Sequence, residues 1–472
     1  KCAEGFTDTK YMEMLLVKEH FLRRYGTIIR RYKIMNDMQK EGVQERLPQF
    51  CAPIFPKCDS IDRLFAVIYL LVGYAFIYAC SSYTFEQNLA LFTIFYGAVV
   101  LAYLWGKEIR PSKESWFWLG VMLSIGVPYA FWSTVHLLQV PVLMAVAAYW
   151  TLSASGRLMK DGRTSQWVIF DGWNALVEVP FCNFICQVQV LFQKKDQETD
   201  GKKPVGGAGG ILLGLLIALP ALAVILPLLS SADAGFQYLI ENMGVSLGDH
   251  LLVVLLRMFF AVPVSFYLFG LIFGGVHGKD TDRIQEEKLI KAAASVRRVP
   301  DTAICTALTV ICLVYCLFIG LQGAYLFSAF GGRIPEDLTY SEYARRGFFE
   351  LCRIGAWNLI IAGCAGGCSR SGRREHKGVG VLLLLLSVLT LLLLATAVSK
   401  MGMYISVYGL TVNRILPLVF MLWMGIAFFC MILRQWKDFP AVRCCILAGA
   451  VMFCLLCLFP IEDWTELYNT WA

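Results

Sequence analysis

The feature that most constrains this chain is the recurrence of apolar blocks of nearly twenty residues with few charges inside them. About 20 apolar residues in a helix are needed to cross the ~30 Å hydrocarbon core of a bilayer. Charged residues make up 16% of the chain, whereas soluble domains carry about 25%. One such block could be a buried core helix, but ten or more indicate an all-α, polytopic transmembrane helical bundle.

We predict eleven membrane spans. They cover residues 64–81, 88–105, 115–132, 134–152, 208–229, 250–275, 302–328, 347–367, 378–399, 414–433 and 443–460. The stretch 166–192 is also apolar, but it carries Asp171 and Glu178 and is interrupted by Pro180. Because carboxylates at membrane depth are costly, we predict an interfacial or re-entrant segment there. If this stretch crossed the membrane, every later loop would change sides.

The distribution of Lys and Arg predicts the orientation. With the N-terminus inside, the inner segments hold 35 of the 42 Lys and Arg residues and the outer loops hold 5. Cytoplasmic loops are enriched in these residues, so we predict the N-terminus inside and the C-terminus outside. The net charge of +7 then belongs to a cytoplasmic collar and does not indicate nucleic-acid binding.

The sequence divides into a cytoplasmic lead-in (1–60), a four-span bundle with the interfacial segment (61–192), a polar linker (193–207) and a seven-span unit (208–472). The chain begins at Lys1 without a signal peptide, which is consistent with a fragment of a longer protein.

Two cytoplasmic segments have helical patterns. Residues 8–40 form a basic amphipathic pattern that suits either an anionic membrane surface or the protein's own cytoplasmic loops. Residues 280–298 predict a charged helix, which is either solvated or a docking site for a cytoplasmic protein partner.

Apparent catalytic motifs have ordinary explanations. Gly244–Gly248 fits G-x-S-x-G, but a nucleophile elbow needs an α/β sheet. Gly274–Asp280 lacks the Ser or Thr of a phosphate loop. Cys454 and Cys457 lie in an apolar span, where thiols serve as packing residues. The five His are scattered without ligand spacing. We therefore predict no catalytic site, no metal site and no cofactor, and regard the protein as non-enzymatic.

Ionisable residues at membrane depth are the better functional candidates, because their burial is costly unless a partner relieves it. Arg257 lies within an apolar span, and Glu350 and Arg353 are three residues apart on one helix face. Arg345 and Arg346 precede that helix. Three interpretations remain open: internal salt bridges, an externally accessible site for an anion, and anchoring to lipid headgroups.

The run Lys400–Arg414 stands between two almost purely apolar stretches and contains Tyr404 and Tyr408. We predict a short polar loop on the outer side, because its composition differs so strongly from that of its neighbours.

Three motifs carry a resemblance to a known family. They are Leu226–Phe236, Glu342–Leu351 and Met403–Met424, followed by Tyr468-Asn469. Across residues 208–472 the chain resembles an uncharacterised family of bacterial polytopic membrane proteins, catalogued as domain of unknown function four-one-five-three / four-one-seven-three. The resemblance implies a multi-pass protein of the bacterial cytoplasmic (inner) membrane and implies no substrate or reaction.

All three motifs fall on the predicted outer side, where we expect an outer-rim cluster. Its members are Asp233, Arg345, Arg346, Glu350, Tyr404, Tyr408 and Arg414. This cluster is either a structural lock or a receiving surface for an envelope ligand.

Two classes of function follow. The first is a non-enzymatic component that senses, scaffolds or regulates at the envelope, and it is favoured by the apolar interior and the distinctive outer loops. The alternative is a transporter or permease for a small anionic or lipid-like solute, favoured by Arg257, Glu350 and Arg353. The expected partners are the lipid bilayer and a cytoplasmic protein, with no nucleic acid. The sequence does not indicate an oligomeric state.

Overall fold

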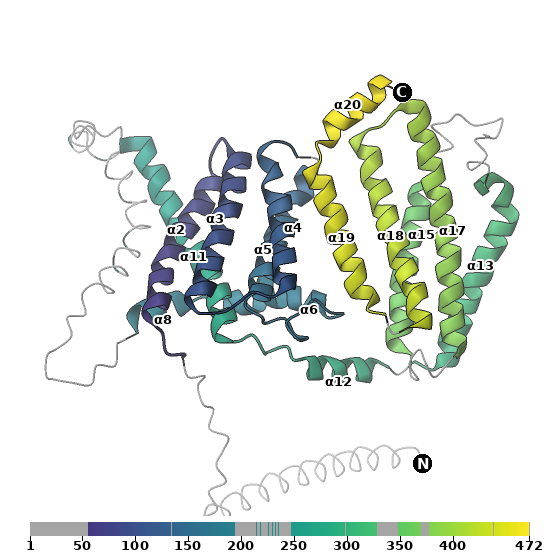
Figure 1. Ribbon diagram of the computed structural model, residues 1–472, viewed down its shortest axis with the longest axis horizontal. Helices are drawn as coiled ribbons and strands as arrows, with labels where there is room; N and C mark the ends of the chain where they lie inside the picture. The colour runs from purple at the N-terminus through teal and green to yellow at the C-terminus, as the bar shows by residue number, and fades with distance from the viewer. Residues whose placement is uncertain are drawn as a thin grey trace, which may run out of the picture. The chain divides into compact units, whose positions relative to one another are not determined.

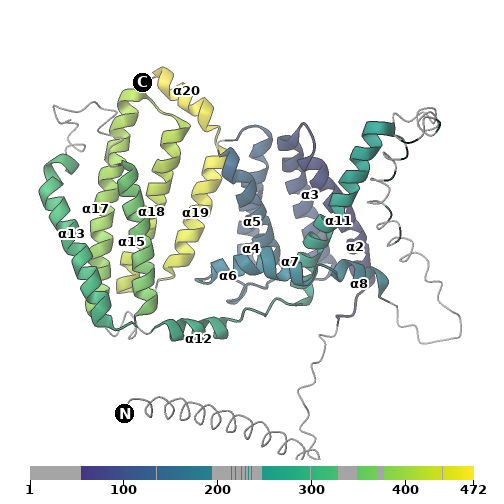
Figure 2. The same cartoon turned by 180° about the vertical axis from the view of Figure 1, so that it is seen from behind.

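Figure 1 shows the computed structural model of the chain, and Figure 2 shows it from behind. The structure describes residues 55–193 except 134, 247–327 except 298, 348–369, 377–437 and 439–471, together with six isolated residues between 214 and 235. Residues Lys1–Lys57 form a unit of their own, and the architecture below is that of the unit Cys58–Ala472. The predicted amphipathic helix of residues 8–40 and the polar linker lie outside the described residues.

Nine helices in the described part of the chain are long and apolar enough to cross a bilayer. They are α2 (Ser60–Cys80), α3 (Phe85–Gly106), α5 (His136–Ala154), α11 (Leu247–His277), α13 (Asp301–Phe327), α15 (Phe348–Cys368), α17 (Lys377–Tyr408), α18 (Val412–Trp436) and α19 (Ala441–Leu458). Apart from two isolated bridges, the described backbone has helices as its only regular elements. The prediction of an all-α protein with many apolar helices is confirmed.

The predicted span 115–132 does not form one long helix. Helix α4 (Lys113–Gly126) ends just before Pro128, and the short 3₁₀ helix η1 (Pro128–Ala130) follows it. Proline has no N–H to continue the α-helical hydrogen bonds, so the helix ends there. At 1.5 Å per residue, α4 is about 21 Å long, which is short for a hydrocarbon core. The predicted span 208–229 lies outside the described residues apart from isolated positions, so the count of eleven stays a prediction.

The segment 166–192 is broken into short helices. These are α6 (Val168–Trp173), the π-helix η2 (Asn174–Glu178), α7 (Val179–Cys182) and α8 (Cys186–Phe192). The chain bends by 44° between α7 and α8. Figures 1 and 2 show α6, α7 and α8 across one end of the neighbouring helices. Such a bend fits a broken span or a re-entrant loop, so its interfacial position stays a prediction.

We call the end of the helices at which α2, α17 and α19 begin the basic end, because the adjoining segments carry most of the Lys and Arg residues. Helices α3, α5, α11 and α18 finish at this end. The other end, where α2 and α17 finish, is called the opposite end.

Helix α11 packs mainly against α2 and α7. Gly270 and Gly274 allow α11 to lie close to α7. A Cβ on Gly270 would lie 2.9 Å from the Pro180 and Asn183 carbonyl oxygens. A Cβ on Gly274 would lie 2.6 Å from side-chain atoms of Val179 and Asn183. The G-x-x-x-G spacing in α11 therefore serves close packing within the chain.

A buried polar link joins α2, α8 and α11. Gln187 donates a 2.6 Å hydrogen bond to the Ala66 carbonyl oxygen and accepts a 2.9 Å hydrogen bond from the Ser265 hydroxyl. Gln187 and Ser265 are fully buried. Because each polar group has a partner, the link fixes how the three helices fit without the penalty of an unpaired buried group.

Asp62 forms an ionic lock at the basic end. Its fully buried carboxylate accepts from the Tyr103 hydroxyl at 2.6 Å, lies 2.8 Å from the Lys107 ammonium and lies 3.2 Å from His277 Nε2. These contacts join the start of α2 to the ends of α3 and α11. Partial burial opposes the charged form of Lys107, but its hydrogen bonds to Asp59 and Asp62 raise its pKa overall.

Helices α13, α15, α17 and α18 pack around two apolar clusters. One is centred on Leu394, Met424 and Phe428, and the other on Leu308 and Leu383. A buried polar chain crosses this region. The Tyr315 hydroxyl donates to Asn358 at 2.8 Å, and the Asn358 amide donates to Thr390 at 2.9 Å. This chain ties α13, α15 and α17 together.

The prediction of a polar loop over Lys400–Arg414 is wrong for most of its length. Helix α17 continues to Tyr408, and α18 begins at Val412, so three residues form the connection. Lys400 is 1% exposed within α17. The polar and aromatic residues of this run remain compatible with a helix, because most of them have ordinary helix propensities.

Candidate functional site

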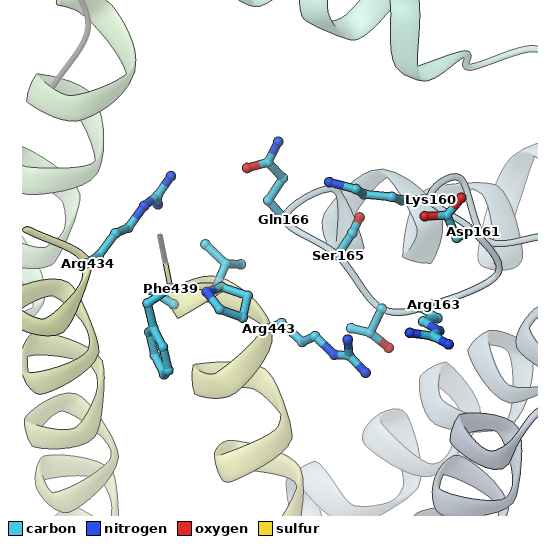
Figure 3. Close-up of a pocket in the computed structure, with 12 residues that line it drawn as sticks. Lys160, Asp161, Arg163, Ser165, Gln166, Arg434, Phe439 and Arg443 are labelled. Carbon is cyan, nitrogen blue, oxygen red and sulfur yellow. The ribbon is translucent and has the colours of Figure 1, made fainter. Parts of the chain in front are cut away.

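A basic cleft lies at the basic end. It has a volume of about 500 Å³ and forms between the loop that follows α5 and the junction of α18 with α19. Figure 3 shows Arg434 on one side, the loop residues Lys160 and Arg163 on the other, and Arg443 between them. None of these four cations was predicted as a site residue.

A tight turn presents the first two cations. Asp161 and Gly162 have φ angles of 52° and 64°, and the Arg163 amide donates to the Lys160 carbonyl at 2.9 Å. Two successive positive φ angles define a type I′ turn, for which Asp-Gly is a favoured pair. Lys160 and Arg163 form an antiparallel bridge, and both are exposed at the mouth of the cleft.

Glu114 connects the two walls of the cleft. One of its oxygens accepts a 2.7 Å hydrogen bond from the Thr164 amide, and the other accepts a 2.7 Å hydrogen bond from the Arg443 guanidinium. The Glu114 side chain is 10% exposed and that of Arg443 is 34% exposed. The ion pair therefore holds the start of α19 against the loop and α4, and it orients Arg443 toward the cleft (Figure 3).

Two aromatic side chains, one from α4 and one from α5, anchor the loop. Trp118 Nε1 and the Tyr149 hydroxyl each donate a 3.0 Å hydrogen bond to the Thr164 hydroxyl. The two rings pack edge to face with centroids 5.0 Å apart. Thr164 is 1% exposed, so the loop has a fixed, buried attachment point and the cations beyond it are held by rigid elements.

The charge balance of the cleft favours an anion. Four cations and the carboxylate of Asp161 line it, and Glu114 offsets part of the Arg443 charge. The first turn of α19 also lines the cleft, and the N–H groups at a helix N-terminus attract negative charge. Arg guanidinium groups match phosphate and carboxylate oxygens in pairs of hydrogen bonds. The cleft is thus suited to a phosphate or carboxylate group.

Behind the loop lies a buried carboxylate with one unsatisfied oxygen. Asp171 is 0% exposed and accepts a 2.9 Å hydrogen bond from the Met159 amide. Its other oxygen and the side-chain oxygen of Asn174 are buried and have no hydrogen-bond partner among the described residues. Burial, opposed by the Met159 hydrogen bond and supported by the charge of Glu286, raises the pKa of Asp171 to about 6. Asp171 lies outside the nine long spans.

Part of the predicted outer-rim cluster comes together at the opposite end. The Arg414 guanidinium lies 4.3 Å from the centroid of the Tyr404 ring and donates to the carbonyl oxygens of Tyr408 (2.8 Å) and Gly409. The Tyr404 and Tyr408 rings are 5.1 Å apart. Arg414 thereby satisfies carbonyl groups at the end of α17, where a cation also suits the helix dipole.

A terminal helix completes this junction. The Asn469 side chain of α20 (Ile461–Trp471) accepts from the Leu410 amide at 2.7 Å and donates to the Leu410 carbonyl at 2.9 Å. Gly409 has φ 79°, and a Cβ there would lie 2.5 Å from Asn469 Oδ1. The motif around Tyr404 and the downstream Asn469 therefore meet as a structural junction.

The structure places the remaining predicted residues apart from this junction or leaves them undescribed. Arg257 lies at the opposite end, beside the last turn of α2. It donates to the Ser81 hydroxyl at 2.8 Å, and its guanidinium lies 5.0 Å from the centroid of the Tyr78 ring. Glu350 and Arg353 lie 3.7 Å apart, as their spacing predicts, and are 60% and 73% exposed. Asp233, Arg345 and Arg346 lie outside the described residues.

The predicted cytoplasmic helix is shorter than expected. Helix α12 covers Glu286–Val296, so residues 280–285 precede it in irregular backbone. None of its residues is buried, which leaves both the solvated and the partner-binding interpretation open. Trp167 donates to Glu286 at 3.2 Å and connects the helix start to the loop of the basic cleft.

Together these features define an integral membrane protein built from many apolar helices, with a basic cleft at one end of them. The chain belongs to the family described as Domain of unknown function (DUF4153), which matches residues 66–472. This match extends the resemblance seen in residues 208–472 through most of the preceding helices. Comparisons with curated proteins and with solved structures gave no match.

Proposed function

We propose that this protein is a non-enzymatic sensing or scaffolding component of a membrane and that the basic cleft recognises a small, water-soluble anion bearing phosphate groups. The observation that carries the proposal is the fixed arrangement of Lys160, Arg163 and Arg443 around one cavity. The Asp-Gly turn fixes the backbone positions of Lys160 and Arg163, and the Glu114 ion pair holds the Arg443 side chain.

The size of the cleft supports a small ligand. Its volume of about 500 Å³ lies within the ~300–1,000 Å³ of small-molecule sites. Its walls consist largely of polar and charged loop residues, with Phe439 and Pro440 at one side. Such walls favour a ligand that is charged over most of its surface. No acid–base pair faces the cleft in a catalytic arrangement among the described residues, so recognition is the simpler role.

The neighbouring elements suit a regulatory output. The loop of the cleft contacts α12 through the Trp167–Glu286 hydrogen bond, and α12 has no buried residue. A ligand that shifts this loop would shift the start of α12, which is available to a protein partner. We propose that the basic end faces the cytoplasm of a bacterial cell, as the Lys and Arg bias indicates. A reporter enzyme that is active only outside the cytoplasm should then be active when it is fused after Ala472.

Calorimetric titration of inorganic pyrophosphate into the purified full chain tests the proposed cleft. The double variant Lys160→Gln with Arg163→Gln should weaken binding by about a hundredfold or more at low salt, because each of the two charged hydrogen bonds contributes at least about 1.5 kcal/mol. The control Lys288→Gln with Lys291→Gln removes two exposed cations from α12 and should leave binding unchanged. Equal losses in both variants would show a general charge effect and would contradict a specific site.

Transport of a lipid-like solute is the second candidate. It is supported by an apolar cavity of about 500 Å³ among α2, α3, α5, α7 and α11, where Pro263 lies in the wall. Uptake of a lipid-like solute into proteoliposomes would favour transport over sensing if Pro263→Ala abolishes the uptake and leaves pyrophosphate binding intact.

A further inference from the structure

A second hollow at the basic end differs chemically from the cleft. It is a groove of about 350 Å³ between the first turns of α17 and the last turn of α18. We call it the α17–α18 groove. The lining residues that determine its chemistry are Lys377, Val381, Leu384, Arg434, Trp436 and Lys437. Arg434 lines both hollows, and the other lining residues belong to the groove alone.

One side of the groove is cationic. Lys377, Arg434 and Lys437 are exposed, and no carboxylate is among the lining residues. Within the described residues, none of these three forms an ion pair shorter than 4.0 Å. Three neighbouring cations with no acidic partner in the described part of the chain repel one another, so an anion that lies among them is stabilised by all three.

The other side of the groove is apolar and belongs to the spans. Val381 is 62% exposed, and Leu384 lies one turn farther along α17. Trp436 is 70% exposed at the end of α18, and tryptophan is enriched at the boundary between membrane and water. The groove therefore presents cations at the water side and apolar side chains of α17 toward the membrane interior, whereas the apolar residues of the cleft, 439–442, lie at the junction of α18 with α19.

We propose that the α17–α18 groove binds one anionic phospholipid, with its phosphate among Lys377, Arg434 and Lys437 and an acyl chain along Val381 and Leu384. This ligand has both chemistries that the groove displays, in the same order across the membrane boundary. Basic pockets between helix ends are known to hold anionic headgroups. The proposal does not rest on the ligand of the basic cleft, although Arg434 lines both hollows.

Recognition in the groove depends on side chains. The end of α18 offers carbonyl oxygens, which do not attract a phosphate. The first turn of α17 on the other side offers N–H groups, whose favourable field offsets that of the α18 end, so the cationic side chains decide the preference. Removal of cations should accordingly abolish the preference for anionic headgroups, while the apolar side should retain a weak, headgroup-independent contact with acyl chains.

Native mass spectrometry of the full chain in detergent tests the proposal with an equimolar mixture of phosphatidylglycerol and phosphatidylcholine that share acyl chains. We expect the wild-type chain to retain phosphatidylglycerol preferentially. The double variant Lys377→Gln with Lys437→Gln should reduce this preference about 30-fold, toward equal retention, since each cation near a headgroup contributes about a factor of five. Val381→Asn should weaken retention of both lipids.

Controls separate the lipid from a free anion and from the cleft. Lys288→Gln with Lys291→Gln should leave the lipid preference unchanged, and the groove variant should still bind pyrophosphate with wild-type affinity. Inorganic phosphate and glycerol phosphate should not displace the lipid at equal concentration. Displacement by these soluble anions, or a preference that survives in the groove variant, would overturn the proposal.

Discussion

Replacement of Asp171 by Asn should stabilise the protein at neutral pH, which is an unusual effect for a substitution at a buried position. The wild-type carboxylate is 0% exposed, and one of its oxygens has no partner among the described residues. An Asn side chain has nearly the same shape, keeps an acceptor for the Met159 amide and adds an NH₂ donor. Asn174 supplies a nearby unsatisfied oxygen three residues along the same helical segment.

The magnitude follows from the pKa. Burial raises the pKa of Asp171 from 3.8 to about 6, so the folded state holds the proton more tightly than the unfolded state. The associated stabilisation is present below the unfolded pKa and is lost as the pH rises through about 6. At 1.36 kcal/mol per pKa unit, the loss is about 3 kcal/mol. Asp171→Asn removes this dependence, so its advantage should reach about 3 kcal/mol above pH 7 and vanish near pH 4.

The assay is thermal unfolding of wild type and variant in one detergent between pH 4 and pH 8. The difference between the two midpoints should rise with pH and level off above pH 7. Glu286 and Tyr149 are the titratable groups near Asp171 on the neighbouring helices, so Glu286→Gln should shift the rise to lower pH. A difference that does not depend on pH, or a variant less stable than wild type at pH 8, would show that the buried Asp171 carboxylate does not set this pH dependence.

Three further substitutions test the packing. Asp62→Asn should destabilise the chain by about 3 kcal/mol in denaturant titrations, because it removes the buried charge that accepts from Tyr103 and pairs with the Lys107 ammonium; an unchanged midpoint would contradict the lock. Gly409→Ala should cost about 1–2 kcal/mol through its positive φ and its clash with Asn469, and a smaller cost in the Asn469→Ala background would identify the clash. Gly274→Val should separate α11 from Asn183, seen as faster hydrogen exchange in α7, whereas unchanged exchange would exclude close packing there.

The sequence predicted the spans well because a bilayer allows few backbone solutions. Nine of the predicted spans correspond to long helices. The failure at α4 comes from Pro128, which ends the helix although the hydropathy continues. The prediction of a loop over Lys400–Arg414 is wrong because polar residues also occur in the last turns of a long helix, so composition does not distinguish the two.

The candidate site was harder to predict. Lys160-Asp-Gly-Arg163 carries the signature of a type I′ turn, so the local geometry was available from the sequence. The assembly of the cleft could not be predicted from the sequence, because it depends on the contact between Glu114 and Arg443, which are 329 residues apart. The partial gathering of Tyr404, Tyr408 and Arg414 was easier to predict, since they lie within one short run.

We propose the basic cleft as a recognition site for a phosphate-bearing anion. A cryo-electron microscopy map of the full chain with saturating pyrophosphate would show whether the ligand lies there. We predict density for the ligand between the Lys160–Arg163 turn and the Arg443 guanidinium, with the Glu114–Arg443 pair intact. A map in which pyrophosphate lies elsewhere on the protein while the cleft is empty would contradict the claim.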